Sequence, residues 1–145
     1  MNSLFNILQL RAVPASANLA LLALRVWLGL SMLLLHGWAK VVTFSTLASH
    51  FPDPFGLGSK TTLILAIFGE VACSALLTVG LFTRLAALGC AAAMATAFFA
   101  VHNSQFTGQH GGELAFIYLA GFVALVLAGG GRFSVDATSH GPAGT

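Results

Sequence analysis

Residues 61–82 read TTLILAIFGEVACSALLTVGLF and contain a single charged side chain, Glu70. A helix that crosses a bilayer needs about 20 mostly apolar residues, so this stretch is long enough to span a membrane. Three further stretches have the same character, at residues 19–38, 85–101 and 113–128. The sequence therefore predicts four membrane-spanning helices.

The composition of the whole chain supports this interpretation. Of 145 residues, 57% are hydrophobic and 7% are charged, whereas a soluble domain carries roughly 25% charged side chains. Six Lys and Arg and four Asp and Glu residues cannot cover the surface of a soluble protein of this size. The composition excludes a cytosolic enzyme and a disulfide-rich secreted domain, and a net charge of +2 indicates no nucleic-acid partner. The expected partner is the lipid bilayer.

The segments between the spans predict how the helices are connected. Only the tripeptide Phe82-Thr83-Arg84 separates the second span from the third, which predicts a tight antiparallel hairpin. The long connection at residues 40–60 includes FPDPFGLG at residues 51–58. Its prolines and glycines prevent a regular helix. Its aromatic residues predict a loop at the membrane interface or folded back over the helices.

An even number of spans places both termini on the same side of the membrane. The positive residues near span ends are Arg11, Arg84 and Arg132 on the terminal side and Lys40 and Lys60 on the other. Because positive residues accumulate on the cytoplasmic side, three against two favours cytoplasmic termini. The chain then divides into a cytoplasmic segment at residues 1–18, a four-helix membrane domain at 19–136 and a polar tail at 137–145.

Two charged residues, Arg25 and Glu70, lie inside the predicted spans. Charges in a bilayer are costly, so they are paired, turned inward or functional. Helix rise places Arg25 roughly 20 Å and Glu70 roughly 13 Å from the outer ends of their spans. An arginine side chain can cover this difference, which predicts an Arg25–Glu70 ion pair facing the interior. The pair either holds two helices together or makes Glu70 a catalytic proton-carrying group whose pKa is controlled by Arg25.

A second polar group collects at the outer ends of the spans. His36 and Lys40 share a helix face because they are four residues apart, His102 ends the third span, and His110 and Glu113 precede or begin the fourth. One pocket formed by these residues would bind a quinone head group or an anion, since imidazoles hydrogen-bond quinone carbonyls. The alternative is that each histidine lies singly at the water interface. The spacing of His, Cys and Asp residues indicates no metal site.

Small and sulfur-containing residues in the second and third spans are interpreted as packing residues. Cys73 and Cys90 lie at similar depth, but the chain has no CxxC motif and no cation near either thiol. Gly89, Ala93 and Ala97 recur every four residues, which is typical of a surface where helices approach closely. This stripe serves either the interior of the bundle or a second copy of the protein.

Several motifs follow one another along residues 19–136. They are Arg25-x3-Gly29, His36-Gly37-x2-Lys40, Glu70, Gly80-Leu81-x-Thr83-Arg84-Leu85-Ala86-Ala87, Gly112-Glu113-Leu114-Ala115 and Gly131-Arg132-Phe133-Ser134-Val135-Asp136. In this order and spacing they resemble the DoxX family of small four-span bacterial membrane proteins. The resemblance implies an all-α, up-down-up-down transmembrane four-helix bundle in the inner membrane, with cytoplasmic termini. The family positions carried over are Arg25, His36, Lys40, Glu70, Arg84, Glu113, Arg132 and Asp136.

The resemblance also implies a function. The family is named after the membrane subunit of thiosulfate:quinone oxidoreductase, and other relatives are associated with redox-stress complexes. We therefore expect a quinone-facing or anchoring subunit of an oxidoreductase, with no covalent cofactor. Its electrons would come from a soluble or membrane redox partner or from the substrate itself. Two alternatives stay open: a homo-oligomer that lets protons or a small solute cross the membrane, and a non-catalytic membrane scaffold.

Overall fold

The computed structural model describes residues 16–108 and 111–139, and within these ranges all regular secondary structure is helical. Three helical rods are long and apolar enough to cross a membrane, at Ala17–Val42, Ser59–Val79 and Thr83–Val101. A fourth apolar helix, Glu113–Ala128, has 16 residues and a length of about 24 Å, which is short for a membrane span. The helical character of the chain and three of its long apolar helices are thus as predicted.

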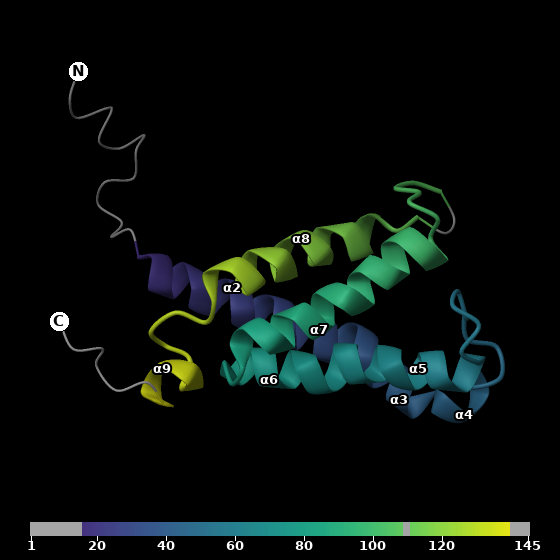
Figure 1. Ribbon diagram of the computed structural model, residues 1–145, viewed down its shortest axis with the longest axis horizontal. Coiled ribbons are helices and arrows are strands. Elements are labelled where there is room, and N and C mark those ends of the chain that lie inside the picture. The colour runs from purple at the N-terminus through teal and green to yellow at the C-terminus, as the bar shows by residue number, and fades with distance from the viewer. Residues whose placement is uncertain (1–15, 109–110, 140–145) are drawn as a thin grey trace, which may run out of the picture.

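The rods are built from consecutive helical elements, which run along the long axis of the molecule (Figure 1). The first comprises α2 (Ala17–Ser31), the π-helical η1 (Met32–Gly37) and α3 (Trp38–Val42), followed by the short α4 (Phe44–Leu47). The second comprises α5 (Ser59–Ile67), the π-helical η2 (Phe68–Cys73) and α6 (Ser74–Val79). The third comprises α7 (Thr83–Ala95) and the π-helical η3 (Thr96–Val101), and it is followed by α8 (Glu113–Ala128) and α9 (Val135–Ser139).

A tight turn joins the second and third rods, as the sequence predicted. Gly80 has a positive φ of 79°, and the amides of Gly80 and Leu81 both donate to the Leu76 carbonyl, which ends α6. The helix α7 then begins at Thr83 because the Asp136 carboxylate accepts hydrogen bonds of 2.7 Å from the amides of Phe82 and Thr83. The turn therefore occupies residues 80–82 rather than 82–84.

Small residues bring the rods into close contact. A Cβ added at Gly29 of α2 would lie 3.0 Å from the Ser74 carbonyl of α6, and one added at Gly69 of η2 would lie 2.9 Å from Ala93 Cβ of α7. A Cβ added at Gly89 would lie 2.5 Å from Cys73 Sγ. Gly89 and Ala93 of the predicted small-residue stripe therefore pack within the chain. Around it lies a core that includes Met32, Cys73, Leu77, Cys90, Tyr118, Phe122 and Leu125.

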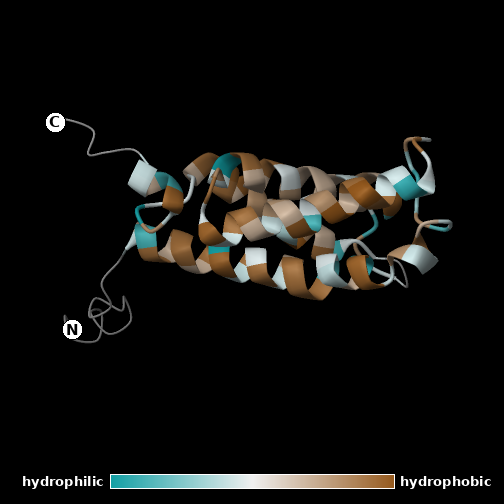
Figure 2. Ribbon diagram, turned by 90° about the horizontal axis from the view of Figure 1, so that it is seen from below, coloured by the Kyte–Doolittle hydropathy of each residue, from teal (hydrophilic) through white to brown (hydrophobic). Residues whose placement is uncertain are grey.

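The outer surface of the rods is rich in large apolar side chains. Trp27, Leu35, Leu85 and Leu127 are among those that are more than half exposed. Hydrophobic residues cover much of the length of the rods (Figure 2). Such a surface is unfavourable in water and is favourable against lipid tails.

The two described ends of the chain lie together, since the Arg132 amide donates a 3.0 Å hydrogen bond to Asn18 Oδ1. Residues 16–18 of the predicted cytoplasmic segment include the start of α2, and residues 137–139 of the predicted tail belong to α9. The remainder of both segments, including Arg11, lies outside the described residues, as does His110.

Candidate functional site

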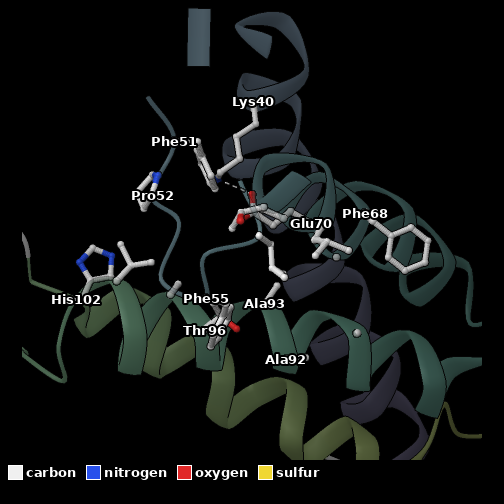
Figure 3. A pocket seen from close by; sticks show the side chains of 18 residues that line it. Lys40, Phe51, Pro52, Phe55, Phe68, Glu70, Ala92, Ala93, Thr96 and His102 are labelled. Atoms are coloured by element: carbon white, nitrogen blue, oxygen red, sulfur yellow. Dashed lines mark hydrogen bonds and ion pairs between the residues drawn. The ribbon is translucent and has the colours of Figure 1, made fainter. Parts of the chain in front are cut away.

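A pocket of about 460 Å³ lies between the second and third rods, next to the loop that follows α4. Pockets that bind small molecules have volumes of roughly 300–1,000 Å³ and mostly apolar walls with a few polar groups. The side chains that line this pocket follow that pattern (Figure 3). Its polar side chains belong to Lys40, Thr62, Glu70, Thr96 and His102.

An ion pair between the first two rods forms part of the pocket wall. Lys40 Nζ on α3 lies 2.6 Å from Glu70 Oε2 on η2, and the two side chains are 23% and 7% exposed. Gly37 makes this approach possible, because a Cβ there would lie 2.7 Å from the Glu70 carbonyl oxygen. The predicted Arg25–Glu70 ion pair is therefore wrong, and Glu70 pairs with Lys40 instead.

Arg25 binds backbone carbonyls near the opposite ends of the rods. Its Nη1 donates to Thr78 O at 3.2 Å and Leu77 O at 3.5 Å, and its Nη2 donates to Phe133 O at 3.0 Å. Helical side chains lean toward the N-terminus of their helix, which directs Arg25 away from Glu70. The last carbonyls of α6 carry partial negative charge and attract a cation. Arg25, which is 1% exposed, thus holds α2 to α6 and to the segment after α8.

The other predicted site residues divide into two groups. Lys40 and His102 line the pocket, as Glu70 does. His36 does not, and its ring instead makes an edge contact with Tyr118 at a centroid distance of 5.5 Å. Glu113 is exposed at the start of α8 and is also outside the pocket lining. The structure therefore brings Lys40 and His102 to one site, adds Glu70 and leaves out His36 and Glu113.

A loop folded back over the helices completes the pocket, and sequence reasoning missed its contributing residues. Phe51, Pro52, Phe55 and Leu57 line the pocket from this segment, which we call the 51–57 loop. Its irregular path was predicted and its return over the helices was one of two predicted alternatives, but its aromatic side chains were not assigned to a site. The useful signal was the presence of two phenylalanines beside prolines and glycines in the irregular stretch at residues 51–58.

Asp53 fixes the 51–57 loop to the start of α5. Its Oδ1 accepts from the Leu57 amide and from Thr62 Oγ1, each at 2.9 Å, and its Oδ2 accepts from the Gly58 amide at 2.7 Å. Desolvation raises the pKa of Asp53, but hydrogen bonds from Gly58, Thr62, Leu57 and Gly56 together hold this pKa below its ordinary value. The ionised carboxylate therefore stabilises the folded loop.

Comparison with known proteins assigns the family. The DoxX family model matches residues 20–103, which is more than half of the chain. The chain belongs to the DoxX family. An uncharacterised protein of Haemophilus influenzae (strain ATCC 51907 / DSM 11121 / KW20 / Rd) is 36% identical over 110 residues, which cover 72% of this chain and 80% of that protein. No solved structure gave a significant match.

The DoxX match includes the residues that build the pocket. Lys40, Glu70 and His102 all lie within residues 20–103, whereas Glu113 and Asp136 lie beyond them. In this DoxX-family membrane protein the pocket offers an ammonium and an imidazole as hydrogen-bond donors and a carboxylate as an acceptor. This set can bind a small polar head group and exchange protons with it. The surrounding apolar wall favours a lipid-soluble molecule.

The two cysteines belong to the core beneath the pocket. Cys90 Sγ donates to the Gly69 carbonyl at 3.3 Å and lies 3.4 Å from Ser74 Oγ. Both Cys73 and Cys90 are free and buried. Their positions fit the interpretation of these cysteines as packing residues, and Cys90 additionally binds the residue that precedes Glu70.

Proposed function

We propose that this DoxX-family protein is a multi-pass protein of the bacterial inner membrane, in which α8 forms a fourth span. The resulting up-down-up-down bundle has both termini in the cytoplasm. The hydrogen bond between Arg132 and Asn18 supports this topology because it joins the two described ends. Cytoplasmic termini are favoured because the sequence has three positive residues on the terminal side and two on the other, namely Arg11, Arg84 and Arg132 against Lys40 and Lys60.

We further propose that the pocket binds the head group of a lipid-soluble quinone and that the protein is the quinone-facing subunit of an oxidoreductase complex. The observation that carries this proposal is the Lys40–Glu70 pair in the wall of a largely apolar pocket. The pocket volume suits a substituted aromatic ring, and the aromatic side chains of the 51–57 loop provide contacts for its faces.

The donor set fits a quinone head group. Lys40 Nζ and the His102 imidazole are donors for quinone carbonyl oxygens, and Glu70 is an acceptor for quinol hydroxyls. A bound quinone supplies the capacity to accept two electrons and two protons. The side chains of this chain orient the ring, exclude water and hold a proton at Glu70 Oε2 or Lys40 Nζ. Electrons come from a redox partner or from the substrate of the complex.

Purification in mild detergent followed by mass spectrometry of the bound lipids tests this proposal. We expect quinone to co-purify with the wild-type protein. The Lys40→Met variant should retain no more than a tenth of the quinone that the wild-type protein retains. Lys60→Met is the matched control, because Lys60 is an exposed lysine outside the pocket. Absence of quinone from the wild-type protein, or equal amounts in both variants, would contradict the proposal.

Glu70→Gln separates this function from its alternatives. A quinone site is expected to lose affinity, whereas a proton-coupled permeation protein reconstituted in vesicles would lose its proton flux. A scaffold would lose stability alone. Glu113→Gln, which changes an exposed glutamate outside the pocket, is the control for all three measurements.

A further inference from the structure

The pocket has an open side that faces the surface of the rods. Leu65 and Phe68 line the pocket from the second rod and are 54% and 60% exposed. Ala92 lines it from α7 and is also exposed. Phe68 lies at the opposite end of the pocket from His102 (Figure 3). The pocket therefore continues from the buried Glu70 to an apolar opening between two rods.

This opening lies at the depth of lipid tails. Phe68 is nine residues after Ser59, the first residue of the second rod, and is thus about 14 Å along a helix that rises 1.5 Å per residue. The hydrocarbon core of a bilayer is about 30 Å thick, so Phe68 lies near its middle when this rod spans the membrane. The exposed apolar residues at the opening then contact acyl chains rather than water.

The 51–57 loop lines the other end of the pocket. Phe51 is partly buried there, Phe55 is 61% exposed, and the Asp53 carboxylate holds the loop to α5 through Thr62 Oγ1. A ligand arriving from water meets this anchored loop. A ligand arriving from the bilayer meets only apolar side chains.

We infer that the ligand of this pocket is an amphiphile with a compact polar head and an apolar tail, and that it enters the pocket laterally from the bilayer. The head lies against Lys40, Glu70 and His102, and the tail leaves between Phe68 and Ala92 into the surrounding acyl chains. This inference rests on the proposed function in that the same pocket holds the ligand. It adds the route and the ligand class, a membrane-dissolved molecule rather than a water-soluble anion.

Fluorescence quenching in vesicles tests the route without any quinone. The two native tryptophans are removed by Trp27→Phe and Trp38→Phe, and Phe51→Trp places an indole at the end of the pocket that the 51–57 loop lines. The protein is reconstituted in phosphatidylcholine brominated on its acyl chains, which quenches indoles that lipid tails can reach. We expect strong quenching by the brominated lipid and little quenching by aqueous acrylamide.

Two further substitutions change the width of the opening. Ala92→Phe should narrow it and reduce quenching by the brominated lipid at least twofold, whereas Phe68→Ala should widen it and increase quenching. Ala120→Phe, at an exposed position of α8 outside the pocket, is the matched control and should have no effect. The lateral route would be overturned if neither Ala92→Phe nor Phe68→Ala changed the quenching by brominated lipid. It would also be overturned if acrylamide quenched the indole more strongly than the brominated lipid.

The outcomes for route and function are distinguishable. If width-dependent lipid quenching is found but no quinone binds, the lateral route stands and the quinone assignment is wrong. If quinone binds but quenching is independent of Ala92 and Phe68, the route is wrong and the proposed function stands.

Discussion

Glu70 and Lys40 form an acid–base pair at a place where neither charge is well hydrated. Their contact of 2.6 Å leaves Glu70 almost fully buried, while Lys40 keeps part of its side chain exposed. Removing one partner of a buried pair costs about 3–5 kcal/mol because the remaining charge is unpaired, whereas replacing both partners is often nearly neutral. The pair is therefore better explained by its chemistry in the pocket than by a large net contribution to stability.

This asymmetry gives a prediction for paired substitutions. Lys40→Met should lower the free energy of unfolding by about 3 kcal/mol, toward the low end of that range because Lys40 is partly exposed. The double variant Lys40→Met with Glu70→Gln should recover most of the loss. Thermal unfolding in detergent measures both effects, with Lys60→Met as a control expected to match the wild type. A double variant as unstable as Lys40→Met alone would contradict the Lys40–Glu70 ion pair.

Arg25 provides a second prediction, because its partners lie away from the pocket. Arg25→Met leaves the carbonyls of Thr78 and Phe133 without this donor, whereas Leu77 O still accepts from the Gly80 amide. Each unsatisfied buried group costs about 1–3 kcal/mol. We expect a clear fall in the thermal unfolding midpoint with unchanged quinone affinity. A variant that unfolds normally but binds quinone weakly would show that Arg25 acts on the pocket after all.

At the scale of helices, the contact between η1 and η2 positions the ion pair. A Cβ at Gly37 would lie 2.7 Å from both the Glu70 carbonyl oxygen and Val71 Cγ2, so Gly37→Ala must push the first two rods apart. Overpacking of this kind costs about 1–3 kcal/mol. We expect lower stability together with weaker quinone binding, measured by unfolding and by equilibrium titration. Ala39→Val, on an exposed part of the same helix, should change neither quantity.

The 51–57 loop gives a prediction on pH. Because the pKa of Asp53 is lowered in the folded loop, the stabilisation that it provides is present above its ordinary value near 3.8. This stabilisation is lost as pH falls through the lowered folded value. Hydrogen exchange at the Leu57 and Gly58 amides, after correction for the intrinsic pH dependence of exchange, should therefore accelerate below about pH 4.

Asp53→Asn supplies the control for this measurement. Asparagine keeps the shape of the side chain but replaces one of the two accepting oxygens by an NH2 group, which cannot accept a hydrogen bond. We expect exchange at Leu57 and Gly58 to be several-fold faster at pH 7, with no further acceleration at acidic pH. Exchange in the wild type that shows no acid-dependent change would indicate that another contact holds the loop.

For the molecule as a whole, the apolar pattern predicted the helices well. Residues 85–101 and 113–128 were expected as spans, and the helices are Thr83–Val101 and Glu113–Ala128. The first rod was underestimated at both ends. Ser16 caps its start by accepting from the Leu19 amide, and no helix-breaking residue stops it before Thr43. This extension carries Lys40 into the helix and toward Glu70.

The candidate site was predictable only in part, for two physical reasons. Helix rise gives the depth of Arg25 and Glu70 but not the direction of their side chains, and Arg25 extends toward the end of its helix away from Glu70. The path of an irregular loop cannot be derived from its composition, so Phe51 and Phe55 were not assigned to the pocket. Lys40 and His102 were predicted to share one pocket, whereas Glu70 was assigned to a separate ion pair with Arg25, and only the fold shows Glu70 in the same pocket.

Photoaffinity labelling with an azidoquinone tests whether a quinone binds in the pocket lined by Lys40, Glu70 and His102. The protein is labelled in bacterial lipid vesicles, digested and mapped by mass spectrometry, with excess unlabelled quinone as competitor. We expect saturable labelling within residues 51–57, 65–70 or 92–102, and its loss in Glu70→Gln but not in Glu113→Gln. Labelling that excess quinone does not displace, or that falls around Arg25 and Phe133, would contradict quinone binding in this pocket.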